Sequence, residues 1–117
     1  MSPWVANFVG DANLVDGDAS GDRAATSLGS IPLVDAAAGP VQVLVRPEAV
    51  DIAPGDGGTV ELIEYYGHDS LYVVRTDAGP SLRARAAAAP RLRRGDRVDL
   101  RYRGPATVAF TTTPVEA

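Results

Sequence analysis

The stretch VQVLVRPEAVDI, residues 41–52, joins an apolar run directly to a charged and rigid corner. Val41, Val43 and Val45 alternate along the run and supply one apolar face of a strand. Pro47 has no backbone N–H and pushes the residue before it into an extended conformation. The ladder of this strand must therefore stop at the proline or continue only at a sheet edge.

Arg46 and Glu48 flank this proline and give the corner two opposite charges. If the backbone stays extended, the two side chains lie on the same side of the chain. They can then pair with each other or reach across to the next strand. We expect both residues to act as structural anchors of the corner.

Alternation with a period of two recurs along the chain, and convincing helical periodicity is nearly absent. In GDRVDLRYRG, residues 95–104, Val98, Leu100 and Tyr102 share the apolar face. PSLRARAA, residues 80–87, repeats the pattern. TVELIEYYG and SLYVVRT predict two more strands on either side of residues 67–69, and ATVAF predicts a short final strand. Short strands with one apolar face each favour a small antiparallel barrel or sandwich.

Turn-forming residues separate these runs. TDAGP, residues 76–80, predicts a tight hairpin in which Gly79 takes a positive φ. We also expect turns at residues 53–58 and 93–96, a loose connection at 36–40 and a single helical turn at 86–90. The segment between residues 12 and 34 predicts several shorter, weaker strands.

The 117-residue length suits one domain with a single core. No apolar run approaches the roughly 20 residues that a membrane-spanning helix needs. There is no cysteine, which excludes disulfides and thiolate metal sites. There is also no lysine, so the chain cannot form a P-loop, whose lysine reaches the nucleotide phosphates.

Charge is divided unevenly along the chain. Up to Pro80 there are three arginines against twelve acids, and from Ser81 onward eight arginines against three acids. The second part predicts a basic face on two neighbouring strands, which we expect to serve as a partner surface formed by Arg83, Arg85, Arg97, Arg101 and Arg103. A basic face on a small barrel also suits single-stranded nucleic acid, but that mode needs exposed aromatic rings, and the basic segment offers only Tyr102 on the apolar face.

No residue set in the chain predicts catalysis or metal binding. His68 is the single histidine; it stands beside Asp69 and Ser70, but adjacent residues of a strand point to opposite faces and do not converge as a triad. Nothing spaces the carboxylates as a transition-metal or calcium site. Glu61 and Glu64 are expected on the solvent face and near a bulge, respectively. We expect no catalytic, cofactor-binding or metal-binding residue.

Four segments in order resemble one protein family. SPWVANFVGDANLVDGD resembles the segment that leaves the nucleotide-binding domain of ABC importer ATPases, with matches at Pro3, Val5, Ala6, Phe8, Val9, Gly10 and Asn13. LVRPEAVDI resembles the Arg-Pro-Glu signature of their TOBE (transport-associated OB) domain. The hairpin around Gly67 and the Gly95-Asp96 turn before the strand ending in RYRG look like later parts of the same domain.

This resemblance implies an all-β fold, a small OB-like (MOP/TOBE-type) antiparallel β-barrel at residues 13–112. Residues 1–12 would be the end of a linker from an absent nucleotide-binding domain, forming a short helical or extended lead-in, and residues 113–117 a tail. The signature positions Arg46, Pro47, Glu48, Gly67, Gly95 and Asp96 would be structural.

The function implied is that of a non-catalytic regulatory and dimerisation domain. The parent would be the ATP-binding subunit of an importer of a small solute, with ferric iron or polyamine ranked first, and it would use ATP and Mg²⁺. Its expected partners are its own nucleotide-binding domain, a second copy of the subunit, permease subunits and a small regulatory ligand. It would be cytoplasmic, at the inner face of the membrane.

Two other classes stay open from the residues alone. One is a stand-alone barrel that binds a small ligand or oxyanion, and the other is an OB-type binder of single-stranded nucleic acid. Salt-dependent binding of an oligonucleotide would distinguish the last class from a transporter domain.

Overall fold

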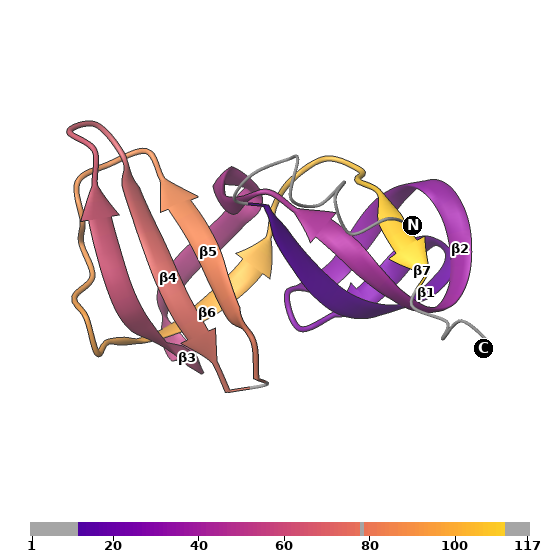
Figure 1. Cartoon of the computed structure of the whole chain (residues 1–117), viewed down its shortest axis with the longest axis horizontal. Helices are drawn as coiled ribbons and strands as arrows, with labels where there is room; N and C mark the ends of the chain where they lie inside the picture. The colour runs from indigo at the N-terminus through magenta and orange to yellow at the C-terminus, as the bar shows by residue number, and fades with distance from the viewer. Residues whose placement is uncertain (1–11, 78, 112–117) are drawn as a thin grey trace, which may run out of the picture.

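The computed structural model describes residues 12–77 and 79–111, and these form two curled sheets placed end to end (Figure 1). One sheet has the order β1-β2-β7 and the other the order β5-β4-β3-β6. All paired strands run antiparallel, apart from an isolated parallel bridge between Leu33 and Thr107. The expected all-β fold of small, OB-like antiparallel type is confirmed by these curled sheets. The expected lead-in and tail fall largely on residues 1–11 and 112–117, outside the described residues.

The first sheet is built mainly from one long hairpin. β1 (Asn13–Thr26) pairs with β2 (Gly29–Val45) along nearly its whole length, and β7 (Ala109–Thr111) adds to the other side of β2. The prediction of shorter, weaker strands here is wrong, and so is that of a loose connection at 36–40, because that segment lies within β2. Gly39, with φ of 80°, and a register shift after Gly21 bend the hairpin without ending it.

Segment 107–111 closes the curl of this sheet. Thr107 donates its backbone N–H to Pro32 O over 3.0 Å, and its carbonyl accepts the N–H of Val34 over 2.8 Å. Its hydroxyl donates to Leu44 O over 2.8 Å, near the other end of β2. One threonine thus connects the two halves of a single bent strand. The register of the first sheet therefore depends on a residue far away in the sequence.

β3 (Val50–Tyr65) is the longest strand of the second sheet and follows a 3₁₀ turn, η1 (Pro47–Ala49). It pairs with β4 (Ser70–Thr76) on one side and β6 (Arg97–Tyr102) on the other, and β5 (Ser81–Ala86) lies beyond β4. The predicted turn at 53–58 is a bulge inside β3 instead. There both Pro54 and Gly58 lie opposite Val98, because the intervening residues loop out of the ladder.

The other turns agree with the sequence except for one. Gly67 and Gly79 take positive φ values of 92° and 135° at the two predicted hairpins. The helical turn expected at residues 86–90 is absent from the structure, where bends follow β5. A run of alanines favours helix, but this run is only four residues long before a proline and is held by contacts to β4.

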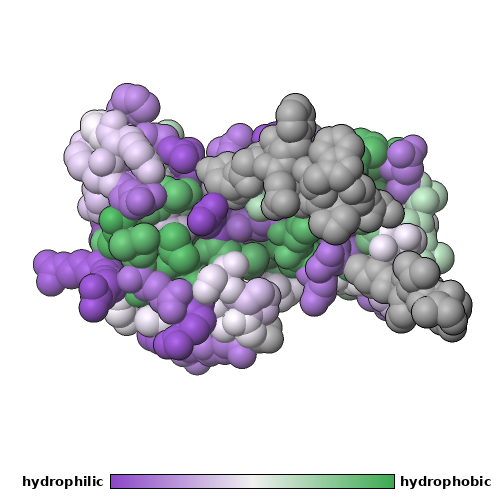
Figure 2. All heavy atoms as spheres, viewed as in Figure 1, coloured by the Kyte–Doolittle hydropathy of each residue, from purple (hydrophilic) through white to green (hydrophobic). Residues whose placement is uncertain are grey.

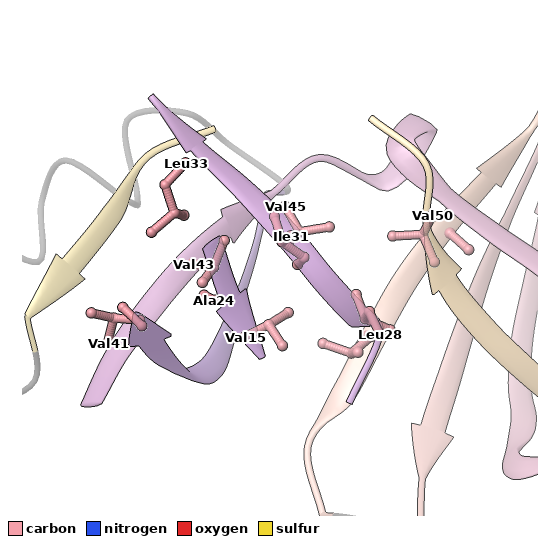
Figure 3. Close-up of a cluster of buried hydrophobic side chains, with 12 residues drawn as sticks. Val15, Ala24, Leu28, Ile31, Leu33, Val41, Val43, Val45 and Val50 are labelled. Carbon is pink, nitrogen blue, oxygen red and sulfur yellow. The ribbon is translucent and has the colours of Figure 1, made fainter. Parts of the chain in front are cut away.

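The larger core lies inside the first sheet and continues to the start of the second (Figure 3). Its central side chains include Val41, Val43 and Val45, which are all fully buried, as the alternation predicted. Leu82 and Ala84 of β5 belong to the same cluster. A second cluster, of Val60, Tyr72, Val74 and Val98, fills the far end of the second sheet. The two sheets therefore share one continuous apolar interior where they meet.

Candidate functional site

The five arginines of the predicted partner surface do not share a face of neighbouring strands. Arg83 and Arg85 lie on β5, whereas Arg97, Arg101 and Arg103 lie on or directly after β6. These two strands are the opposite edges of the four-stranded sheet, separated by β4 and β3. The prediction that they are neighbours is wrong, because strands consecutive in sequence need not pair when β3 is long enough to take both partners. The role of these arginines as a partner surface stays a prediction.

Three of the five form ion pairs within the domain. Arg85 Nη1 lies 2.7 Å from Asp69 Oδ2, and Arg103 Nη1 lies 3.0 Å from Asp51 Oδ2. Arg97 contacts two carboxylates. For Arg83 and Arg101, both exposed, the described residues provide no ion pair. The charge that is available for a partner is therefore smaller than the sequence suggested.

Arg97 of β6 forms hydrogen bonds with β3, with the bulge inside β3 and with the residue after β4. Its guanidinium donates to Asp56 in the β3 bulge, to Asp77 after β4 and to Thr59 of β3. The hydrogen bond from Arg97 lowers the pKa of the Asp77 carboxyl below its ordinary value of 3.8. The same bond to Asp77, followed by that to Asp56, raises the pKa of Arg97. This geometry assigns Arg97 a structural role at the surface.

The Arg-Pro-Glu corner is formed by Arg46 and η1. Pro47 is fully buried, and the Arg46 and Glu48 side chains are exposed. Ala49 donates its N–H to Arg46 O over 2.9 Å, and Ala49 O accepts the N–H of Arg103 over 2.7 Å. In the described part of the chain no ion pair joins Arg46 to Glu48. The geometry of the corner thus depends on backbone bonds and on the buried proline ring.

The β3–β4 hairpin carries a compact polar cluster around Gly67. Tyr66 donates its hydroxyl to Glu64 Oε1 over 2.8 Å, and this bond raises the pKa of Tyr66. The Arg85 guanidinium lies over the Tyr66 ring, 5.4 Å from its centre. His68 Nδ1 lies 3.2 Å from Asp69 Oδ1, but the His68 side chain is 88% exposed. An exposed imidazole beside one carboxylate, with no positioned nucleophile, is not a triad.

The Gly95-Asp96 turn before β6 has the expected geometry. Gly95 has φ of 95°, and Asp96 Oδ2 accepts the N–H of Arg93 over 2.8 Å. Gly95 also donates its N–H to Val60 O, and Val60 donates to Asp96 O. These bonds extend the β3–β6 ladder into the turn, so both residues have structural contacts.

Two features were missed in the sequence. The Asn13 side chain forms two hydrogen bonds with the backbone of Arg83. These bonds satisfy backbone groups on the edge of β5 that does not pair with β4. A hollow of about 490 Å³ also opens beside Tyr72 and the segment after β5. Asn13 was visible only as a matched position of a family pattern, and hollows between distant segments leave no signal in sequence.

The described residues contain neither a cluster suited to a metal ion nor a helix suited to span a membrane. No group of three or more His, Asp or Glu side chains among residues 12–77 and 79–111 could hold a metal ion. Within the same residues, no helix has the length and apolar character to cross a bilayer. Figure 2 shows apolar surface across the part of the molecule formed by β3–β6. Separately, the Leu62 side chain of β3 is 48% exposed.

The curled antiparallel sheets, the Arg-Pro-Glu corner and the Gly-Asp turn are the features expected of a transport-associated OB domain. The sequence profile of the TOBE domain matches residues 43–110, more than half of the chain. The chain belongs to the TOBE domain family.

Among curated proteins, the chain is similar to three from Rhodococcus jostii (strain RHA1): "Fe(3+) ions import ATP-binding protein FbpC 1", FbpC 2 and FbpC 3. Each is 33% identical over 110 residues, which cover 86% of this chain. The chain spans 32% of the length of each relative. These relatives are thus much longer than the chain, and the similarity concerns one part of them.

Proposed function

We propose that this chain is the non-catalytic regulatory and dimerisation domain of the ATP-binding subunit of an ABC importer for ferric iron. The observation that carries this proposal is the 33% identity to proteins named as ATP-binding subunits for Fe(3+) import, combined with the TOBE match. A polyamine importer is the second choice for the solute. ATP and Mg²⁺ would be bound by another part of the parent subunit, since this chain has no P-loop lysine.

In this proposal the domain holds two ATP-binding subunits in register and biases their closure, which is a coupling role. A contact surface for the second copy is supported by the end of β3 and the residue after it, where Leu62, Tyr65 and Tyr66 are between 48% and 53% exposed. Apolar and aromatic side chains that remain exposed in one short segment are typical of subunit contacts. The parent would lie at the cytoplasmic face of the membrane through its permease subunits.

The class of the parent is tested by reading the gene upstream of the codon for Met1. We expect an in-frame ATPase domain with Walker motifs. A stop codon directly upstream, with a promoter at this point, would contradict the proposal. Salt-dependent binding of a single-stranded oligonucleotide by the 117-residue chain would favour the nucleic-acid class instead.

The dimer contact and the solute need separate measurements on the parent subunit. Leu62→Glu should weaken dimerisation in sedimentation experiments, because it places a charge in an apolar contact. Val34→Glu is the matched control, since Val34 is similarly exposed but lies on β2. Uptake of radiolabelled ferric iron into cells should require the parent gene, and loss of polyamine uptake alone would exclude iron.

A further inference from the structure

A hollow of about 490 Å³ opens within the second sheet and the connection that follows β5. It lies between the first half of β3, the inner side of β4 and β5, and the connection from β5 to β6. Figure 1 shows this connection, in orange, running along the outer end of the sheet. The volume is within the range of small-molecule sites. The lining residues are Ile52, Ala53, Pro54, Tyr72, Ala86, Ala88, Ala89, Arg91 and Leu92.

Hydrogen bonds to β4 hold one wall of the hollow in place. Four alanines line the hollow and leave space that larger side chains would fill. The connection that bounds it is tied to β4 at two points. Ser70 donates its hydroxyl to Ala88 O over 2.7 Å, and Arg91 donates its backbone N–H to the Tyr72 hydroxyl over 3.1 Å. Because these walls are already ordered, ligand binding loses little free energy in ordering them.

Its charge differs from that of three other hollows in the described residues. Arg91 is its single charged lining residue, whereas each of those three has at least one carboxylate. The described residues offer Arg91 no ion pair, and the same holds for Arg93 and Arg94 in the next turn. The nearby carboxylate of Asp96 instead accepts the backbone N–H of Arg93. An anion would complement this charge.

Tyr72 supplies a second donor at the wall of the hollow. The residue is only 2% exposed, and its hydroxyl oxygen accepts the Arg91 N–H. No acceptor for the hydroxyl proton is found among the described residues, so the proton can be donated to a ligand. Buried polar hydrogens normally have an acceptor, and one lining a cavity indicates where a ligand oxygen fits.

We propose that this hollow binds a small organic carboxylate with an apolar body. The carboxylate lies between the Tyr72 hydroxyl and the Arg91 guanidinium, and the body packs on Ile52, Pro54 and Leu92. This inference goes beyond the importer assignment and does not depend on it, because it rests on the hollow alone.

The test uses octanoate as the probe and the 117-residue chain, followed by amide NMR shifts and calorimetry. Saturable shifts confined to residues 86–92 and to the first half of β3 are expected. Octan-1-ol has the same body without the charge and should bind about tenfold more weakly, since it loses the charge-assisted hydrogen bonds. Equal binding of octanol and octanoate would overturn the choice of an anion.

Three variants test the site itself. Arg91→Ala should weaken octanoate binding about tenfold without changing octanol binding. Ala89→Leu fills the hollow from an exposed position and should abolish binding of both probes. Tyr72→Phe should weaken octanoate more than octanol while keeping the ring.

Arg23→Ala, on β1 of the other sheet, is the matched control and should leave binding unchanged. Thermal melting of each variant separates a lost site from a lost fold, and Ala89→Leu is the variant expected to melt like the parent chain. Octanoate binding that survives both Ala89→Leu and Arg91→Ala would overturn the proposal. So would a dimer in sedimentation whose formation excludes the probe, because a second copy would then occupy the hollow.

Discussion

The side-chain amide of Asn13 pairs with the backbone of Arg83 as a neighbouring strand would. Asn13 Nδ2 donates to Arg83 O, and Asn13 Oδ1 accepts the Arg83 N–H, both over 2.9 Å. The two residues are 70 positions apart and belong to different sheets. This bond pair satisfies part of the open edge of β5 and fixes the start of β1 against the second sheet.

Replacing this asparagine should destabilise the domain. Asn13→Ala leaves a backbone donor and acceptor of β5 without partners, so we expect a loss of about 1–3 kcal/mol in the free energy of unfolding. Urea unfolding followed by circular dichroism measures it. Gln42→Ala is the control, because Gln42 bonds only to the exposed Asp16 side chain, and its effect should stay within about 0.5 kcal/mol. Similar losses in the two variants would argue against an edge role for Asn13.

Adding a Cβ atom at Gly58 should also destabilise the domain. A Cβ there would lie 2.8 Å from Val74 Cγ1 and 2.9 Å from Arg75 O, both on the neighbouring strand β4. Gly58→Ala should therefore cost about 1–3 kcal/mol, because backbone must shift to make room. The closest neighbour of a Cβ at Gly57 is the Asp99 carboxylate, at 3.0 Å, which can rotate into solvent. Gly57→Ala should be nearly neutral in the same unfolding measurement, and a larger effect there than at Gly58 would contradict the packing argument.

The bond between Arg97 and Asp77 should make stability depend on pH in the acidic range. Because the pKa of Asp77 is lower in the folded state than its ordinary value of 3.8, the pair contributes stability above that pH. The contribution is lost as the pH falls through the lower, folded pKa. Asp77→Asn should thus lower the melting temperature at pH 7, and this difference should shrink at pH 3.

The control for this pH effect is Asp18→Asn, which changes an exposed carboxylate on β1. We expect it to lower the melting temperature less than Asp77→Asn at pH 7. A melting difference for Asp77→Asn that grows on acidification would reverse the sign predicted from the pKa and exclude this account.

The residues of the Arg-Pro-Glu corner should differ in how much each contributes to stability. Pro47 is the buried member, so Pro47→Ala should cost about 1–2 kcal/mol through lost apolar burial. We expect Arg46→Ala to lower the melting temperature by less, because its side chain is exposed and the corner bonds use its backbone carbonyl. If Arg46→Ala proves as damaging as Pro47→Ala, the guanidinium must be an anchor after all.

Alternation along the chain was sufficient to predict the strands around residues 41–45, 81–86 and 97–102. The turn residues of TDAGP likewise predicted the positive φ of Gly79, because all these features depend on residues within a few positions of one another. The bulge at 54–58 and the long β1–β2 hairpin were not predictable in this way. Glycine and proline predict a turn locally. Here β3 pairs with β6 on both sides of the bulge, and β1 pairs with β2 on both sides of Gly21, so neither strand ends there.

The sequence was enough to predict the all-β class, the turns at Gly67, Gly79 and Gly95, and the ordered motifs of the TOBE family, and it contains no lysine for a P-loop. Three features follow from the tertiary structure alone: β5 and β6 are opposite edges of one sheet, Arg97 joins β3 to the segment after β4, and Asn13 pairs with the open edge of β5. The hollow beside Tyr72 and Arg91 belongs to the same group. Propensity and alternation depend on residues a few positions apart, so they can be recognised in the sequence. Sheet edges, ion pairs and hollows depend on segments that are distant in sequence and come together only when the sheets curl.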